Sequence, residues 1–238
     1  MNSKLKGNLY LIPATIGEGA VDKVIPSYNQ SIINKIDIYI VEEVRTARRF
    51  LKKAGIIKPI DELTFYVLNE HSKDHEISSY LDAIKEGKHI GLLSEAGVPC
   101  IADPGAAIVK IAQSNNINVI PLVGPSSIFM ALMASGFNGQ QFAFLGYLPV
   151  DKKFRVDKLK EIEKNIYQKN ETQLFIETPY RNNQMIESIL STCRNETMLC
   201  IATDVSMDSE YIKTKSIAQW KKSIPDINKR ATVFLLYK

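Results

Sequence analysis

The stretch Ser94–Gly105, SEAGVPCIADPG, decides how we interpret this chain. It follows a short apolar run, His89–Leu93, and precedes a segment with the apolar spacing of a helix. Two glycines, two prolines and two acids stand within its twelve residues. Glycine lets backbones approach closely and proline fixes φ, so the stretch predicts a loop of defined shape after a buried strand.

On either side of this loop, short apolar runs alternate with stripes of helical spacing. One stripe, Val44, Ala47, Leu51 and Ala54, recurs at steps of three and four and stops at Gly55. Such alternation predicts a mostly parallel sheet with helices on its faces. Further stripes are expected around 77–84, 107–112 and 128–133, and the expected strands are Asn8–Ile12, Asp37–Val41, Thr64–Leu68, His89–Leu93 and Ile117–Leu122.

The pattern changes after Phe137–Gln141, FNGQQ, which is the best linker candidate. The last strands of the chain are close enough in sequence to pair antiparallel. We therefore predict an N-terminal α/β domain over residues 1–139 and a smaller, mixed C-terminal α+β domain over residues 140–238. Helices are expected around 159–166 and 185–190, and strands at Gln173–Glu177, Met198–Ala202, Glu210–Ile217 and Ala231–Tyr237.

No charged residue occurs from Ser114 to Val150. That length would suffice for a membrane helix, but glycines, prolines and polar residues interrupt it. We expect a buried strand, a loop, a helix buried at four apolar positions and a linker, with no membrane partner. The four positions are Ile128, Phe129, Leu132 and Met133.

The end of this uncharged span predicts an apolar patch, which is a liability on an isolated surface. A homodimer would cover it by two-fold pairing; the alternative is that the second domain of the same chain covers it. The residues concerned are Phe137, Phe142, Phe144, Tyr147 and Leu148.

Composition sets the broad class. The chain has 238 residues, 45% of them apolar, and a net charge of +4, which permits a nucleic-acid partner without requiring one. Arg45–Lys53, RTARRFLKK, predicts a solvated basic helix face. Three cysteines without a CxxC pair and the lack of an apolar leader favour a cytoplasmic location.

His71 and His75 are four residues apart without a third ligand nearby, so we predict no metal site.

Two unusual loops are expected at the carboxyl ends of the fourth and fifth expected strands, which are consecutive in the sequence, and open α/β sheets bind ligands at such ends. The second is Val123–Ser127, VGPSS, which leads directly into a helix. Neither GxxxxGK[ST] nor GxGxxG after a strand occurs. The loops therefore predict a crevice that holds a small polar ligand through main-chain and apolar contacts.

Five motifs in order resemble those of the tetrapyrrole methylase family, and within it the branch that methylates a cytidine ribose 2′-hydroxyl in small-subunit ribosomal RNA. The resemblance implies a two-domain class III methyltransferase fold with S-adenosylmethionine in a cleft between the domains. The motifs are LYLIPATIG (9–17), VEEVRTARRFLKKAGI (41–56), LLSEAGVPCIADPG (92–105), VIPLVGPSS (119–127) and LFIETPYR (174–181).

The resemblance also carries cofactor contacts onto matching positions of this chain. Those in the expected first domain are Pro13, Ile16, Val98, Ile101, Ser126 and Ser127, and those at strand ends of the second are Thr178, Ala202 and Thr232.

A hydroxyl acceptor benefits from a general base. Glu95 is our preferred candidate and Glu42 the next; Glu43 and Asp103 also lie near expected strand ends. Each acid has the alternative role of a helix cap or an ion pair. Arg45 and Arg181 are candidates for holding a phosphate or a substrate carboxylate, with a surface ion pair as the alternative.

Together these features predict an S-adenosylmethionine-dependent methyltransferase that acts on ribose in small-subunit ribosomal RNA, with the RNA or the small ribosomal subunit as its partner. Two alternatives stay open. One is a family methyltransferase with a tetrapyrrole or other small acceptor. The other is a non-catalytic S-adenosylmethionine-binding paralogue, because several motif acids differ from the family pattern.

Overall fold

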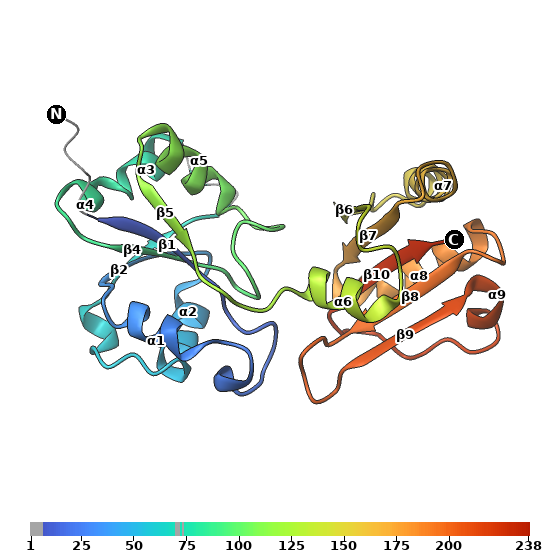
Figure 1. Ribbon diagram of the computed structural model, residues 1–238, viewed down its shortest axis with the longest axis horizontal. Helices are drawn as coiled ribbons and strands as arrows, with labels where there is room; N and C mark the ends of the chain where they lie inside the picture. Colours follow the sequence, from blue (N-terminus) through green and yellow to red (C-terminus); the bar gives the residue numbers. More distant parts are fainter. Residues whose placement is uncertain (1–6, 70–71, 73) are drawn as a thin grey trace. The chain divides into compact units, whose positions relative to one another are not determined.

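The computed structural model describes residues 7–69, 72 and 74–238 and forms two compact units, Met1–Ser126 and Ser127–Lys238 (Figure 1). Each unit contains a five-stranded sheet with helices packed on it. The first sheet is parallel and the second is mixed, which confirms the predicted fold class.

The first unit has its strands in the order β3-β2-β4-β1-β5. The central strands β2 and β4 are buried throughout, as expected for a sheet covered on both faces. One core cluster joins the sheet to α1 and α2, and another joins it to α3, α4 and α5 (Figure 1). The elements are β1 (Asn8–Ile12), α1 (Ser27–Ile33), β2 (Ile38–Val41), α2 (Val44–Lys53), β3 (Thr64–Val67), α3 (Asp74–Ser79), α4 (Asp82–Lys85), β4 (Ile90–Leu93), α5 (Ala106–Ser114) and β5 (Asn118–Pro121), with 3₁₀ turns at Val21–Lys23 and Ile60–Glu62.

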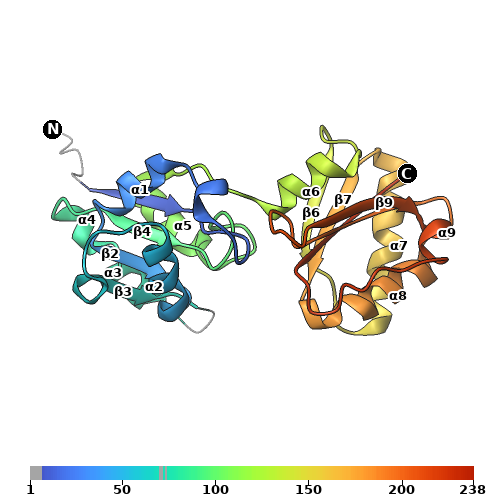
Figure 2. The ribbon, with the colours of Figure 1, turned by 90° about the horizontal axis from the view of Figure 1, so that it is seen from below.

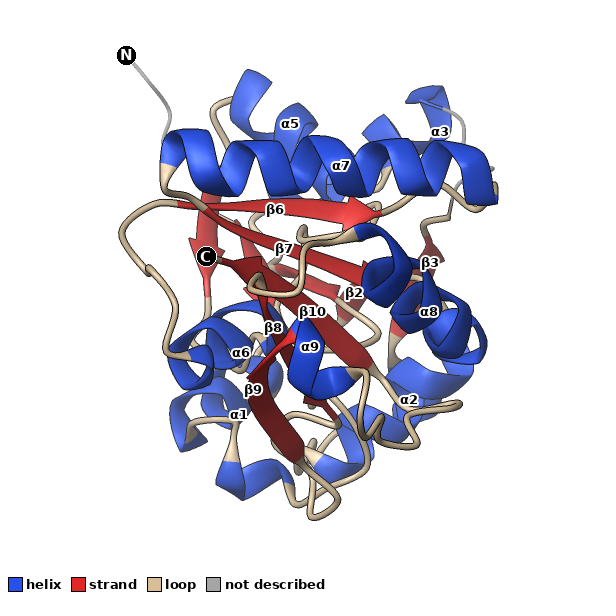
Figure 3. Ribbon diagram, turned by 90° about the vertical axis from the view of Figure 1, so that its right-hand side faces the viewer, coloured by secondary structure: helices blue, strands red, loops and turns tan. Residues whose placement is uncertain are grey.

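The second unit has the strand order β6-β7-β10-β8-β9, which Figure 3 displays in sequence. β6 pairs parallel with β7, and the other neighbours pair antiparallel, as predicted for the last strands. Helices α7 and α8 pack on one face and α6 on the other (Figure 2). The elements are α6 (Ser127–Ser135), β6 (Phe142–Tyr147), α7 (Lys152–Lys169), β7 (Thr172–Glu177), a 3₁₀ turn (Pro179–Arg181), α8 (Asn182–Thr192), β8 (Met198–Thr203), β9 (Tyr211–Ser216), α9 (Ile217–Trp220) and β10 (Thr232–Tyr237).

Helix α6 belongs to the second unit, so the two units divide at Ser126–Ser127 and not after residue 139. Its apolar side chains pack against β8 and β10. Ile128 and Leu132 are buried there, but Phe129 is 54% and Met133 81% exposed. The expectation that all four positions are buried is wrong for the last two, because the helix packs through only one face.

A strand that the sequence analysis did not predict, β6, directly follows the expected linker and contains Phe142, Phe144 and Tyr147 of the expected aromatic patch. Three phenylalanines of the patch pack, partly buried, against the core of the second unit, and Leu148 is buried. Only Tyr147 of the five is largely exposed. The same unit of the same chain therefore covers most of the patch, which removes the sequence-based reason for a homodimer.

One further difference concerns local structure. The helix expected around 77–84 is divided into α3 and α4. Within the described ranges, none of the helices combines the length and the apolar character needed to span a bilayer. His71 lies outside the described residues.

Candidate functional site

Three loops meet at the carboxyl ends of β1, β4 and β5, which are neighbours in the first sheet. The backbone N–H of Ala14 donates to the carbonyl oxygen of Gly97 at 2.9 Å, which joins the loops after β1 and β4. A Cβ on Gly124 would lie 2.2 Å from Cγ of Pro13, so the loop after β5 lies directly against the loop after β1. The two loops singled out in the sequence therefore adjoin each other and the first loop.

The motif loop Ser94–Gly105 has a fixed, strained backbone. Gly97, Cys100 and Ala102 all have positive φ, an unfavourable conformation for the two residues that have a side chain. The Asp103 carboxylate accepts hydrogen bonds from the backbone N–H groups of Cys100 and Gly105 at 2.8–2.9 Å. Ser94 Oγ donates to the Gly97 carbonyl at 2.6 Å. This is why the loop contains polar residues as well as glycine and proline: they hold its shape.

Cys100 in this loop is not a nucleophile candidate. Burial, followed by the charge of Asp103, raises the pKa of its thiol to about 11, so the thiol stays protonated at neutral pH.

The predicted cofactor residues of the first unit lie on these loops. Pro13 is buried, Ile16, Val98 and Ser126 are half-buried, and Ile101 is 48% exposed. A Cβ on Gly97 would lie 3.1 Å from the Pro125 carbonyl oxygen, so the motif loop lies against the loop after β5 at this position, where a side chain would be crowded.

The predicted cofactor residues of the second unit gather at one edge of its sheet. Thr232, at the start of β10, pairs with Glu177 at the end of β7 and with Thr203 at the end of β8. Thr178 follows Glu177 directly, and Ala202 precedes Thr203. Ser127 is the exception, because it begins α6.

Arg181 has a partner at this edge. Its Nη2 lies 2.5 Å from Glu177 Oε1, and the Glu177 side chain is only 1% exposed. The buried carboxylate also accepts from the Thr178 backbone N–H. The ion-pair alternative therefore holds for Arg181, and the pair is buried where a surface pair was expected.

The four candidate acids differ in whether their side chains have a structural role. Glu43 is the N-cap of α2, where its side chain accepts from the Arg45 N–H, and Asp103 holds the motif loop. Glu42 and Glu95 remain without such a structural role. They follow β2 and β4, whose last residues Val41 and Leu93 are paired in the sheet.

Glu42 and Glu95 influence each other. Burial, then the charges of Asp103 and Glu95, raises the pKa of Glu42, and a hydrogen bond from the Glu95 backbone opposes this shift. Glu95 is exposed, and its Oε1 accepts from Thr46 Oγ1 at 2.7 Å. Glu42 is thus the more buried carboxylate of the two, and Glu95 is the more accessible one.

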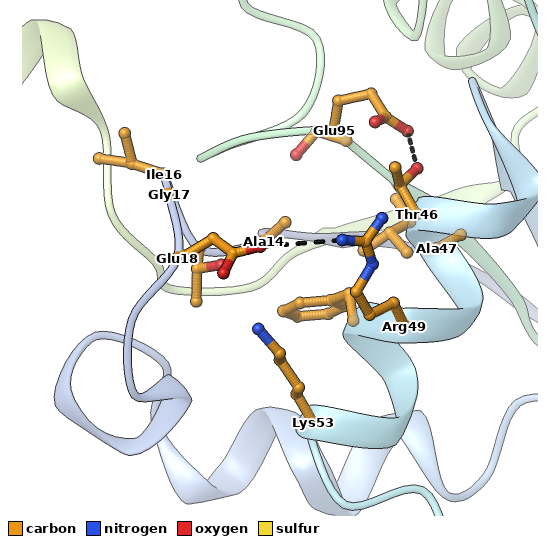
Figure 4. A pocket seen from close by; sticks show the side chains of 13 residues that line it. Ala14, Ile16, Gly17, Glu18, Thr46, Ala47, Arg49, Lys53 and Glu95 are labelled. Carbon is orange, nitrogen blue, oxygen red and sulfur yellow. Dashed lines mark hydrogen bonds and ion pairs between the residues drawn. The ribbon is translucent and has the colours of Figure 1, made fainter. Parts of the chain in front are cut away.

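Glu95 also lines a pocket of about 190 Å³ in the first unit, called here the α2 pocket (Figure 4). Its walls come from the loop after β1, from α2 and from the end of β4. The lining residues are Ala14–Glu18, Thr46, Ala47, Arg49, Phe50, Lys53 and Leu93–Glu95.

Comparison with known proteins shows the family to which the chain belongs. No family model matches the chain. A ribosomal RNA small subunit methyltransferase I from Buchnera aphidicola subsp. Schizaphis graminum is 30% identical over 240 residues, which cover 99% of this chain and 80% of the relative. The chain belongs to the ribosomal RNA small subunit methyltransferase I family. The member from Pasteurella multocida is 29% identical over 98% of this chain and 80% of its own length. The member from Bacillus subtilis is 34% identical over 77% and 59%, respectively.

Solved structures agree on the fold of this family member. The methyltransferase CobJ has a TM-score of 0.64 at 15% identity and covers 98% of this chain and 94% of its own. A uroporphyrin-III C-methyl transferase from Thermus thermophilus, complexed with S-adenosyl homocysteine, has a TM-score of 0.58 at 13% identity and covers 98% of each chain.

Sequence reasoning about this methyltransferase missed the roles of Arg49 and Lys53 as pocket residues, because it assigned them to a solvated basic face. The signal was present: Thr46, Arg49, Phe50 and Lys53 recur at the three- and four-residue steps that place side chains on one face of a helix. What the sequence lacked was the loop that this face meets.

Proposed function

We propose that this protein transfers the methyl group of S-adenosylmethionine to a ribose 2′-hydroxyl of small-subunit ribosomal RNA. The observation that carries the proposal is the 30% identity, over nearly the whole chain, to a relative named for methylation of small-subunit ribosomal RNA. The three joined loops and the pair of acids Glu42 and Glu95 support it, because they provide the two things that such a reaction needs: a shaped place for the cofactor and a base.

The loops suit the cofactor chemically. S-adenosylmethionine supplies an activated methyl group on a positively charged sulfonium. Residues 94–105 and 123–127 contain two carboxylates and no lysine or arginine, so these loops do not repel that charge. We propose that Pro13, Ile16, Val98, Ile101 and Ser126 contact the cofactor from the first unit, and that Ser127, Thr178, Ala202 and Thr232 contact it from the second.

The reaction needs alignment more than activation, because the sulfonium is already reactive and the acceptor hydroxyl must be held in line with the methyl group. A carboxylate near the hydroxyl accepts its proton as the new C–O bond forms. We propose Glu95 for this role because it is exposed, with Glu42 behind it. Glu42, whose pKa is raised by burial and by the charges of Asp103 and Glu95, provides a second carboxylate near Glu95.

The test is methylation of small ribosomal subunits isolated from a strain that lacks this protein. With labelled S-adenosylmethionine, the purified protein is expected to label one ribose in the RNA, and the added methyl group should block alkaline cleavage after that nucleotide. Label on a base, or none on RNA with transfer to a uroporphyrin, would contradict the proposed acceptor. Absence of S-adenosylmethionine binding in calorimetry would contradict the cofactor as well.

A cytoplasmic location and a homodimer are also part of the proposal. The first is supported by the ribosomal substrate, and the second by the family resemblance of the sequence. Sedimentation equilibrium tests the dimer directly: a monomer mass across micromolar concentrations would refute it. Cell fractionation tests the location, and recovery of the protein outside the cytoplasmic fraction would refute that part.

A further inference from the structure

The α2 pocket brings two cations close to the candidate base. Arg49 and Lys53 are one helical turn apart on α2, and both line the pocket together with Glu95. In Figure 4 their side chains extend from α2 into the pocket, and Arg49 lies between Glu95 and Lys53. The charged residues that line the pocket are therefore these two cations and two acids, Glu95 and Glu18.

The positive charge of α2 is not balanced by acidic residues of the same helix. Val44–Lys53 contains five basic residues and no acid. Arg48 is engaged elsewhere, 3.5 Å from Asp61 and over the ring of Phe65. The other cations have to find partners outside the helix or in solvent.

Arg49 and Lys53 are available for such a partner. Arg49 lies 3.7 Å from Glu18, but the side chains are 52% and 82% exposed. An exposed pair of this kind contributes little and exchanges readily for a stronger anion. Lys53 has no ion pair with any residue in the described part of the chain. Both groups are thus able to bind an anion that enters the pocket.

The shape of α2 relates these cations to Glu95. Thr46, in the first turn of the helix, holds Glu95 Oε1. Arg49 follows about 4.5 Å and Lys53 about 10.5 Å further along the helix axis, at 1.5 Å per residue. A ribose 2′-hydroxyl is on the carbon next to the one whose oxygen bears the following phosphate. A hydroxyl presented to Glu95 therefore brings a phosphodiester with it.

We propose that Arg49 and Lys53 bind the RNA phosphate that flanks the target ribose, and so fix the position of the 2′-hydroxyl at Glu95. This inference rests on the proposed function and names the part of the substrate that the pocket holds. The pocket volume of about 190 Å³ agrees with a phosphate and part of a sugar, since it is smaller than the roughly 300–1,000 Å³ of a pocket that takes a drug-sized ligand.

The experiment compares Arg49→Gln, Lys53→Gln and the double variant with Lys52→Gln. Lys52 is an exposed cation on the same helix that does not line the pocket, so it controls for net charge and helix propensity. Thermal unfolding by circular dichroism verifies that each variant folds. The readouts are KM and kcat for small ribosomal subunits, KM for S-adenosylmethionine, and the salt dependence of binding to a single-stranded ribosomal RNA fragment.

We expect the double variant to raise KM for the subunits about tenfold, because the charge-assisted hydrogen bonds to the phosphate are no longer made. The slope of log affinity against log salt should fall by about 0.7 for each phosphate of the single strand that the variant no longer neutralises. KM for S-adenosylmethionine should not change, and Lys52→Gln should behave like the wild type.

Unchanged RNA affinity and salt slope in the double variant overturn the inference, even where the wild type methylates RNA. An equal loss of affinity in Lys52→Gln also overturns it, because the effect would then be general charge. If the wild type binds RNA without methylating it and the double variant loses that binding, the phosphate site is supported and the proposed methyl transfer is refuted. The two hypotheses therefore fail separately.

Discussion

Replacement of Gly124 by alanine tests whether the loops after β1 and β5 are in the contact that the structure shows. The new Cβ would lie 2.2 Å from Cγ and 2.3 Å from Cβ of Pro13. An ordinary contact is no closer than 3.4 Å, so the proline ring or the loop must move by about 1.2 Å. A proline ring cannot rotate away, so the backbone has to move.

Forced overpacking of this size costs about 1–3 kcal/mol of unfolding free energy. The displacement also acts on Pro13, a proposed cofactor contact, so the affinity for S-adenosylmethionine should fall. Gly19→Ala is the matched control in the same unit, because a Cβ there meets nothing within 4 Å. Its effect should be close to zero, or a gain of about 0.4–1 kcal/mol from the restricted unfolded chain.

The assay is urea unfolding followed by circular dichroism, together with calorimetric titration of S-adenosylmethionine. Loss of stability in Gly124→Ala with normal binding would mean that the loop after β5 moves and Pro13 stays in place. Stability and affinity both equal to those of Gly19→Ala would refute the reasoning, since the two loops could then not be in contact as described.

Three further predictions use the same measurements. Gly97→Ala and Gly136→Ala both place a side chain at positive φ, which costs about 1–2 kcal/mol. Only the new Cβ at position 97 meets a neighbouring atom, so Gly97→Ala should lose more stability than Gly136→Ala. Gly97→Ala should also weaken S-adenosylmethionine binding, and Gly136→Ala should not. Burial raises the pKa of Glu42, so ionisation of this side chain destabilises the folded protein once the pH rises above the pKa of the unfolded chain, near 4.5. The stability of Glu42→Gln relative to wild type should therefore increase between pH 4 and pH 7, and a stability difference that does not change with pH would contradict the shift. Arg181→Met leaves the buried carboxylate of Glu177 unpaired and should cost about 3 kcal/mol, most of it recovered when Glu177→Gln is added.

The sequence by itself determined most of the local elements and the family, although α1, β6 and α9 were not predicted. Strand and helix positions follow from spacings of two and of three to four residues, which are local properties of the chain. The motif loop was recognisable because the residues that shape it, glycine, proline and two acids, stand close together in the sequence. Asp103, for example, forms its hydrogen bonds within that loop. The fold class followed from the order of these elements. The roles assigned to individual cofactor residues are still predictions.

Only the tertiary structure decided which distant residues meet. Glu42 and Glu95 are 53 positions apart in the chain, and they approach because β2 and β4 are neighbours in the sheet. Their position near the end of an expected strand made both Glu42 and Glu43 candidates, whereas the start of α2 makes Glu43 its N-cap. The basic face of α2 was visible as a pattern, but a pattern shows which side chains share a face and not what that face meets. The answer depends on strand pairing and loop contacts between segments far apart in sequence, which no local spacing encodes.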